Sequence, residues 1–322
     1  MRVLLTGAGG FIGSHLLRRF LRDGDHAVAV VLRPGRTRTR IDGLLDSVEV
    51  IPGDLVNAET LAEPVHRFAP EIVVHAAWAV PTAKNRNSVE HAEHVHYTIS
   101  LLKLAHAAGA GHFVGIGSQA EYGAAADRHQ TQAAGQPSTL YGTAKLCAGM
   151  LAERVCATVG MRFAWLRLFS AYGPGEDPTW LIPAMCAKFM AREKPATTAG
   201  EQRYDYLYID DVAEAVHRVA IQAPATGFFD LGSGRGVAVR EVIERVRDLI
   251  SSALPALPIG FGEVPYAADQ VMRMEANIDR LQEITGWRPQ IDLETGLRRA
   301  VDWFRRVHEQ AIATKEKPND RN

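Results

Sequence analysis

The sequence of 322 residues lacks the features that mark several classes of protein. It has only three cysteines, Cys147, Cys156 and Cys186, and no CxxC pair, so neither a zinc knuckle nor a disulfide framework is predicted. No apolar run is long enough to cross a membrane, and the formal net charge of −1 argues against nucleic acid or an anionic membrane as the main partner. No secretion signal precedes the first predicted strand. We therefore expect a soluble, cytoplasmic protein with reduced thiols.

What the sequence does contain is a regular alternation of two patterns. Short runs rich in β-branched residues lie at 3–5, 27–32, 48–51, 71–77, 112–117 and 162–168. Between them lie helical patterns, such as the one in which Ile12, Leu16 and Phe20 share a face opposite Arg18 and Arg22. Strands alternating with helices predict an α/β fold with a doubly wound parallel sheet of the Rossmann type. The near-continuous apolar strands agree, since such sheets are buried on both faces.

After residue 172 the alternation becomes less regular. Helical patterns near 180–192, 211–222, 239–251 and 294–308 are mixed with proline-rich loops. We divide the chain into a dinucleotide-binding domain, 1–172, and a smaller mixed part, 173–322, which binds the substrate over the carboxyl edge of the sheet. Segments within 204–232 are expected to return to the first domain, and the polar tail, 313–322, is predicted to be disordered.

The stretch TGAGGFIG, residues 6–13, joins the first predicted strand to the first predicted helix. Gly7, Gly10 and Gly13 have the GxxGxxG spacing, which permits a tight turn and lets the backbone approach a pyrophosphate at the helix N-terminus. A glycine triplet alone also occurs in ordinary strand–helix turns, but here the flanking strand and helix agree with the motif. The three glycines, with Phe11 and Ile12 between them, are therefore candidate dinucleotide-binding residues.

The end of the second predicted strand bears on which dinucleotide is bound. An acidic residue there would hold the ribose 2′-hydroxyl of NAD, but Asp23 and Asp25 lie before the strand, at its other end. The strand instead runs into RPGRTRTR, with arginines at 33, 36, 38 and 40. Guanidinium groups suit a 2′-phosphate, so NADP (NADPH) is favoured, with Arg33 as the candidate contact, and NAD stays possible.

The stretch YGTAK places Tyr141 and Lys145 four residues apart, on one face if the segment is helical. A free tyrosine has a pKa of about 10, and lowering it by about three units needs roughly 4 kcal/mol of differential stabilisation. We expect the Lys145 ammonium and a positively charged nicotinamide to lower the pKa of Tyr141, which then exchanges a proton with a sugar oxygen. Ser118, at the end of the fifth predicted strand, would hold the same oxygen.

Together these motifs resemble the extended short-chain dehydrogenase/reductase family, which contains sugar-nucleotide epimerases, dehydratases and ketoreductases. TGAGGFIG, GDL (53–55), HAA (75–77), SQAEYG (118–123), YGTAK, RLFSAYGP (167–174) and YIDDVAEA (208–215) occur in the family's order, and LGSGRGVAVREV (231–242) and TGWRPQIDLETGL (285–297) extend the match almost to the C-terminus. The resemblance implies Ser118, Tyr141 and Lys145 as the catalytic set. Its implied cofactor contacts are Asp54 and Leu55 near the adenine, Ala76 and Ala77 against the ribose, and Trp78 and Leu168 as further walls of the cleft.

Departures from the family pattern narrow the chemistry. Family 4,6-dehydratases carry an acid pair, or a serine and a glutamate, directly after the catalytic hydroxyl, whereas Gln119 and Ala120 stand there in this chain. Glu121 comes one position too late, and on a strand or extended turn its side chain should point elsewhere. Dehydration is therefore disfavoured, and reduction of a ketone or epimerisation remains.

The positions that clamp the nucleotide sugar in the family also differ. Ser170 replaces the usual asparagine, Tyr204 stands where arginine is common, and Tyr266 replaces another arginine. The candidate substrate-binding residues are Gln119, Ser170, Arg203, Tyr206 and Arg273. A nucleotide-sugar partner is expected, while its base and sugar stay open.

The stretch EHAEHVHY, 90–97, contains three histidines, but on a helix only His91 and His94 share a face, so no metal site is predicted at His91, His94 and His96. We interpret the stretch as part of a long amphipathic helix at the interface of a homodimer. By comparison with the family, His94 stands nearest the asparagine that supports the catalytic lysine through water.

The sequence thus predicts an NADPH-dependent reductase of a nucleotide-linked 4-keto-6-deoxy sugar, with Tyr141 as general acid. The alternative is an NAD-retaining sugar-nucleotide 4-epimerase, which returns the same hydride to the opposite face of the sugar. A cofactor-binding regulator without catalysis is disfavoured, because Ser118, Tyr141 and Lys145 are all present.

Overall fold

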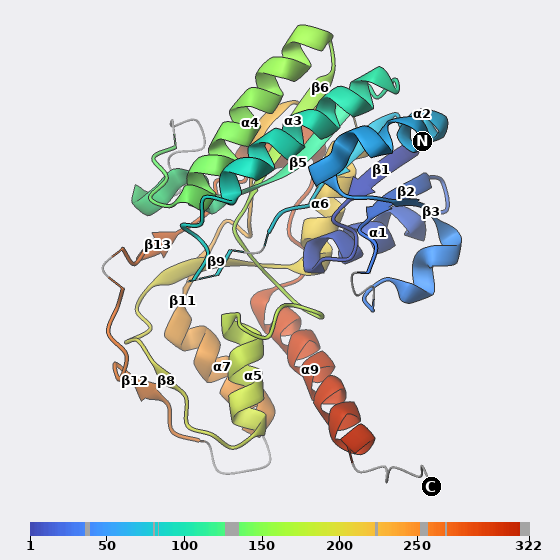
Figure 1. The fold of residues 1–322 in the computed structure, drawn as a ribbon. Helices are drawn as coiled ribbons and strands as arrows, with labels where there is room; N and C mark the ends of the chain where they lie inside the picture. The colour runs from blue at the N-terminus through green and yellow to red at the C-terminus, as the bar shows by residue number, and fades with distance from the viewer. Residues whose placement is uncertain are drawn as a thin grey trace, which may run out of the picture.

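The computed structural model describes residues 1–35, 39–79, 81–82, 84–125, 135–222, 225–251, 257–267 and 269–315. Its centre is a parallel sheet in the order β10-β6-β5-β4-β1-β2-β3 (Figure 1). The strands are β1 (Arg2–Thr6), β2 (Ala27–Leu32), β3 (Glu49–Pro52), β4 (Ile72–His75), β5 (His112–Ser118), β6 (Arg162–Leu168) and β10 (Gly227–Leu231). The α/β class and the six strands predicted in the first half are confirmed, and β10 joins them from the second half.

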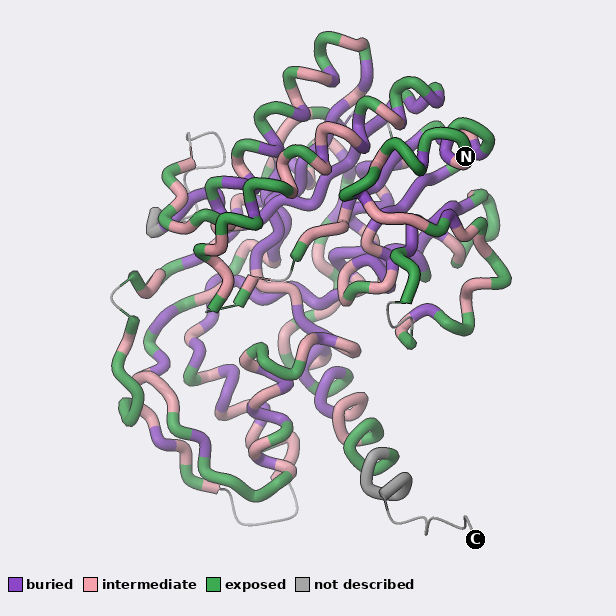
Figure 2. The backbone as a smooth tube through the Cα atoms, viewed as in Figure 1, coloured by how far each residue is buried: buried purple, intermediate pink, exposed green. Residues whose placement is uncertain are grey.

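Helices bury both faces of this sheet. α1 (Phe11–Arg22) and α6 (Ile209–Ile221) cover one face, while α2 (Ala62–Phe68), α3 (His91–Ala107) and α4 (Leu140–Val159) cover the other. Successive residues of β1 therefore enter different cores: Val3 packs in the core that contains α1, and Leu4 packs in the core that contains α3. Figure 2 shows the strands as buried backbone, with exposed residues on the outer turns of the helices.

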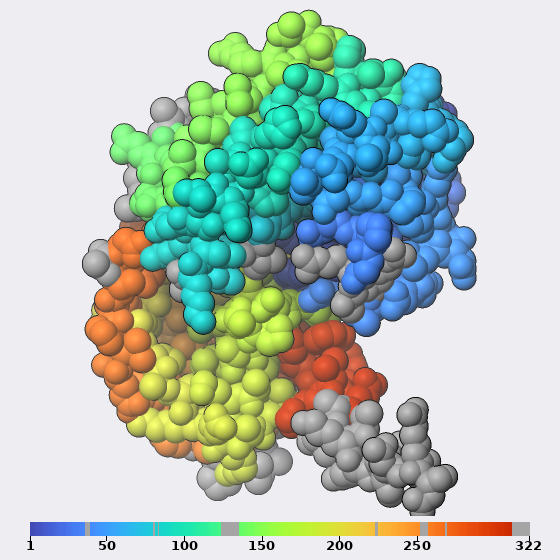
Figure 3. All heavy atoms as spheres, in the orientation of Figure 1, coloured from blue at the N-terminus to red at the C-terminus, as the bar shows by residue number. Residues whose placement is uncertain are grey.

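A smaller mixed sheet follows the sixth strand of the chain. In it β9 (Arg203–Tyr208) pairs in parallel with β7 (Ser170–Tyr172) and β13 (Arg273–Met274), and antiparallel with β11 (Gly236–Ala238). The remaining elements are β8 (Ala196–Thr197), β12 (Gly260–Phe261), α5 (Leu181–Met190), α7 (Val239–Ser251), α8 (Asp279–Thr285), α9 (Leu293–Lys315) and the short 3₁₀ helices η1 (Asp42–Ser47), η2 (Leu55–Leu61) and η3 (Gln119–Ala125). Figure 3 shows the N-terminal atoms, in blue to green, above the C-terminal atoms, in yellow to red.

The second half of the chain contributes to both parts. α6 and β10 complete the layers of the first half, whereas α5, α7 and α9 pack on one another around the smaller sheet. The division at residue 172 therefore stays an interpretation. α9 extends to Lys315, so the disordered tail predicted for 313–322 stays a prediction. Residues 316–322 lie outside the described residues.

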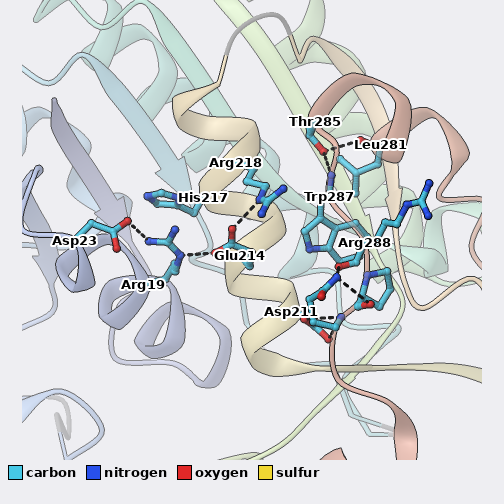
Figure 4. Close-up of polar contacts among 12 residues, drawn as sticks. Arg19, Asp23, Asp211, Glu214, His217, Arg218, Leu281, Thr285, Trp287 and Arg288 are labelled. Carbon is cyan, nitrogen blue, oxygen red and sulfur yellow. Dashed lines mark hydrogen bonds and ion pairs between the residues drawn. The ribbon is translucent and has the colours of Figure 1, made fainter.

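Polar contacts fix α6 between the two halves (Figure 4). On one side, Glu214 accepts a hydrogen bond from Arg19 of α1 at 2.5 Å, and Arg19 also pairs with Asp23 at 2.7 Å. On the other side, Asp211 accepts the backbone N–H groups of Gln290 and Ile291 at 3.1 and 2.9 Å. The acidic start of α6 thus holds the C-terminal segment against the sheet.

Candidate active site

A cavity of about 570 Å³ lies at the carboxyl ends of β1, β4, β5 and β6, where the smaller sheet meets the large one. This edge is where parallel α/β sheets bind ligands. The predicted site residues that line it are Gly7, Gly10, Phe11, Ile12, Gly13, Ala76, Trp78, Leu168, Ser118, Gln119, Tyr141, Lys145, Ser170 and Tyr206. The fold therefore brings the glycine loop, the three predicted catalytic residues and part of the predicted substrate set to one cavity.

Six other predicted site residues do not line this cavity. Arg33 and Asp54 form a partly exposed ion pair at 3.8 Å, beyond the ends of β2 and β3. Leu55 and Ala77 belong to the core beneath α3. Arg203 donates to the Gly236 carbonyl at 2.6 Å, and Arg273 lies exposed on β13, paired in register with Arg203. Arg36 and Arg38 lie outside the described residues, and Arg40 donates to the Gly175 carbonyl at 3.0 Å.

The glycine loop has the close packing that its spacing predicts. Gly7 has a φ of +78°, and a Cβ there would lie 2.6 Å from the Ala76 carbonyl carbon. At Gly13 a Cβ would lie 2.0 Å from the Gly7 oxygen. Gly10 differs, because its Cβ would meet only the Gly7 oxygen, at 3.2 Å, and it begins α1 without a side-chain cap. This open, positively polarised helix start fits the pyrophosphate of a dinucleotide.

We expect Gly13→Ala to destabilise the protein by about 1–3 kcal/mol, because the new methyl group forces the loop away from α1. Urea unfolding would measure the loss, and fluorescence quenching should show weaker dinucleotide binding. Gly43→Ala is the matched control, since a Cβ at Gly43 has nothing within 4 Å and its φ is not positive. Equal stability of the two variants would contradict the packing argument.

The start of α4 carries two of the three predicted catalytic side chains. Thr139 caps the helix by accepting the Gly142 N–H at 3.1 Å, so Tyr141 and Lys145 lie on its first two turns. The Ser118 hydroxyl, at the end of β5, hydrogen-bonds the Tyr141 hydroxyl. The Lys145 ammonium donates to the Ile116 carbonyl at 2.7 Å. One strand end and one helix start therefore bring a serine, a tyrosine and a lysine together.

Burial sets the ionisation of these groups. It raises the pKa of Tyr141 to about 12, against the opposing hydrogen bond from Ser118. It also lowers the pKa of Lys145 to about 7, against the opposing negative charge of Glu121. The low tyrosine pKa that the YGTAK spacing predicts is therefore not produced by the protein's own groups, because desolvation outweighs the favourable contacts.

Glu121 points away from the cavity, as the sequence predicts, although it lies on η3 rather than on a strand. Its fully buried carboxylate accepts the Ser118 backbone N–H at 2.8 Å, the Trp165 indole N–H at 2.9 Å and the Arg167 Nε–H at 2.8 Å. Its neighbour Gln119 lines the cavity. Glu121 thus anchors the backbone of Ser118 from behind.

Several cavity residues lie outside the predicted set. Glu176 is 8% exposed, its Oε2 has no hydrogen-bond partner in the part of the chain that the structure describes, and burial raises its pKa to about 8. Tyr206, which does belong to the predicted set, likewise has a buried hydroxyl without a partner among the described residues. Further lining comes from Trp180, Gln202, Tyr204 and Gln270. Glu176 could have been predicted from the sequence, because it comes directly after YGPG, at the end of a strand and beside the predicted substrate-binding part.

The histidines of α3 do not gather around one point. His91 accepts the Trp78 indole N–H at 3.3 Å, His94 stacks on the Trp78 ring, and His96 contacts Ser100. Among the described residues, no three histidine, cysteine or acidic side chains lie close enough together to hold a metal ion. Within the same residues, no helix combines the length and the apolar character that crossing a membrane requires.

Comparisons with known proteins show which proteins this chain is similar to. Residues 3–232 match the model of the NAD dependent epimerase/dehydratase family. The chain is 28% identical to a UDP-glucose 4-epimerase of Azospirillum brasilense, covering 97% of this chain and 94% of that protein. It is 27% identical to a GDP-6-deoxy-D-mannose reductase of Pseudomonas aeruginosa, covering 96% and 99%. A solved UDP-glucose 4-epimerase of Thermus thermophilus, in complex with NAD, has the same fold, with a TM-score of 0.83, 24% identity, and coverage of 95% and 99%.

Proposed function

Because this chain belongs to the NAD-dependent epimerase/dehydratase family, we propose that it reduces a nucleotide-linked 4-keto-6-deoxy sugar with NADPH. The observation that carries the proposal is the meeting of Ser118, Tyr141 and Lys145 with the glycine loop at one cavity. A bound NADPH would supply the hydride. Ser170, Tyr204 and Tyr206 of the smaller sheet line the same cavity, and we place the sugar beside them.

The ionisation of the site is compatible with reduction of a carbonyl group. Since the pKa of Tyr141 is raised to about 12, its hydroxyl holds a proton at neutral pH and can give it to a carbonyl oxygen that becomes an alcohol. Ser118 would hold the same oxygen by its hydroxyl. The Lys145 ammonium would stabilise the phenolate left on Tyr141.

The cofactor preference rests on Arg33, which is the first residue after β2. Its side chain is 54% exposed, and its ion pair with Asp54 is long, at 3.8 Å, so the guanidinium can turn toward a 2′-phosphate. No acidic residue follows β2 before residue 36, and an acid at that place is what a 2′-hydroxyl requires. These features support NADPH over NADH.

We expect Arg33→Ala to weaken NADPH binding by about tenfold or more, because a charge-assisted contact with phosphate is lost. NADH binding should change little. Cofactor fluorescence titrations of both dinucleotides would measure the ratio, with Arg67→Ala as the control, since Arg67 is an exposed arginine paired with Glu63 of the same helix, α2. An unchanged preference between NADPH and NADH would remove the cofactor argument.

Dehydration is disfavoured by the positions directly after Ser118. Gln119 and Ala120 have no acidic group, and the carboxylate of Glu121 is committed to Arg167. The second candidate is an NAD-retaining sugar-nucleotide 4-epimerase. It is favoured by the names of the relatives, which include a UDP-glucose 4-epimerase and a dTDP-L-rhamnose 4-epimerase of Burkholderia thailandensis, 26% identical to this chain.

One experiment separates the two candidates. Purified protein is incubated with NADPH and a panel of UDP-, dTDP- and GDP-linked 4-keto-6-deoxy sugars, and the loss of absorbance at the reduced nicotinamide is followed. Stoichiometric oxidation of NADPH is the expected result. Tightly bound NAD in the purified protein, with interconversion of 4-hydroxy epimers and no net oxidation of NADPH, would establish the epimerase instead.

The homodimer predicted from the sequence is part of this proposal. Met150 and Leu151 are 54% and 48% exposed on α4, which supports a second copy of the chain as the partner of this helix. Sedimentation equilibrium would give the mass in solution. A single-chain mass at micromolar concentration would reject the homodimer.

A further inference from the structure

We propose that Trp78, held by His91 and His94, is a positioning residue that carries the Lys145 ammonium on its indole face and keeps it protonated beside Tyr141. The inference rests on the proposed function only where it assigns Lys145 a part in catalysis. The contacts themselves do not depend on that assignment.

The surroundings of Lys145 leave the indole as its main partner besides a carbonyl group. The ammonium lies 3.9 Å from the centroid of the Trp78 ring and 5.8 Å from that of Trp165, and the side chain is 5% exposed. Its hydrogen bond to the Ile116 carbonyl uses one of three N–H donors. Among the described residues no carboxylate forms an ion pair with it, because Glu121 is bonded to Arg167. A cation this deeply buried gains most from the negative face of an aromatic ring.

The Trp78 ring is itself fixed in place. Its indole N–H donates to Nδ1 of His91 at 3.3 Å, while Nε2 of His91 faces the Asn85 carbonyl at 3.0 Å. His91 therefore carries its proton on Nε2, which leaves Nδ1 free to accept. The ring of His94 stacks on the indole, with centroids 4.8 Å apart and planes 22° from parallel. Two histidines on successive turns of α3 thus orient the indole.

The same assembly contacts Tyr141. The His91 and Tyr141 rings meet edge to face with centroids 5.2 Å apart, and the Trp78 ring lies 6.4 Å from that of Tyr141. The Tyr141 backbone N–H donates to the Arg86 carbonyl at 2.9 Å. The chain segment between β4 and α3 therefore supports both the phenol and the ammonium, and a shift of Trp78 would move the two relative to each other.

The neighbouring titratable groups add no competing positive charge at neutral pH. Burial lowers the pKa of His94 to about 4 and that of His75 to about 3, and it lowers the pKa of His91 as well. His75 is held between Thr6 and Thr98 at 2.8 and 3.0 Å. Other charged or titratable groups are Glu121, which faces Lys145, the oppositely charged Arg33 and Asp54, which act on His94, and Tyr141, which stays protonated. Neutral histidines can therefore support the indole without repelling the ammonium.

The contact can be tested without any substrate or cofactor. The chain has five tryptophans, so protein labelled with 5-fluorotryptophan should give separable ¹⁹F resonances, and Trp78→Phe identifies the one from residue 78. We expect that resonance to titrate near neutral pH and to stop titrating in Lys145→Met. A resonance that does not move, or that moves equally in Lys145→Met, would overturn the proposal.

Activity gives a second, separate readout. Removing the aromatic ring lowers the pKa of Lys145, and the required ammonium is lost as pH rises through that pKa. In Trp78→Leu the decline of kcat/KM for reduction should therefore move to lower pH by about one unit or more. Trp78→Phe keeps an aromatic ring, so its pH profile should lie close to that of the wild type.

The two readouts distinguish this inference from the proposed function. If Trp78→Leu lowers kcat but kcat/KM declines at the same pH as in the wild type, Trp78 only lines the cleft. That result would overturn the positioning role. Failure of the wild-type protein to oxidise NADPH with every 4-keto sugar would reject the proposed reaction, while the ¹⁹F titration would still decide the contact.

Discussion

Replacing Tyr141 by phenylalanine is expected to lower the turnover of reduction by about 10²–10⁴-fold, the range of a lost general acid. The variant loses one hydroxyl, which in the structure is hydrogen-bonded to Ser118 and lines the cavity. Its ring contacts with His91 and Trp78 stay. Dinucleotide affinity should therefore change little, so the loss falls on turnover rather than on binding.

Steady-state rates and cofactor fluorescence titrations on the same preparation measure both quantities. Tyr97→Phe is a suitable control, because this tyrosine on α3 lies outside the cavity lining and keeps its ring in the variant. Turnover of Tyr141→Phe within threefold of the wild type would show that another group supplies the proton.

The sequence predicted those features of the site that depend on local pattern. The alternation of strands and helices placed β5 and α4, and the YGTAK spacing placed Tyr141 and Lys145 on one helix start, because both depend on periodicity within a segment. The position of Ser118 near these residues was predictable as well, since the carboxyl ends of parallel strands meet at one edge of the sheet. The glycine loop needed only the strand before it and the helix after it.

Features that depend on three-dimensional burial were not predictable in the same way. The expected fall in the pKa of Tyr141 includes the charge of a bound nicotinamide, whereas burial within the protein alone raises that pKa. The histidines at 91 and 94 were considered as metal ligands or as interface residues, whereas their contact with Trp78 joins two segments through the fold. The predicted role of Arg203 in substrate binding has a related weakness. Its place on a strand does not determine where its long side chain points, and in the structure it donates to the Gly236 carbonyl.

The buried carboxylate of Glu121, which holds the backbone of Ser118, is expected to contribute strongly to the stability of the protein. Glu121→Ala should destabilise the protein by about 3–5 kcal/mol, the range found when one partner of a buried ion pair is removed. The change takes the carboxylate from Arg167 and the acceptor from the Ser118 and Trp165 N–H groups, all of which are buried. Arg167 also donates to the Tyr122 hydroxyl at 2.8 Å, which in turn donates to Asp230 at 2.7 Å, so the loss extends along a buried polar chain.

Urea unfolding of three variants separates the charge from the hydrogen bonds. Glu121→Gln keeps a carbonyl oxygen as acceptor without the charge, so its loss should be smaller than that of Glu121→Ala. Arg167→Met added to Glu121→Gln also removes the hydrogen bond to Tyr122 and the positive charge near Asp230, so the double variant should be less stable than Glu121→Gln. Because Glu121 also holds the backbone of Ser118, turnover in Glu121→Gln should fall even at temperatures where the protein stays folded. If Glu121→Ala lowers the free energy of unfolding by less than about 1 kcal/mol, this carboxylate contributes no more than an ordinary surface ion pair. That result would contradict its role as the anchor of Ser118.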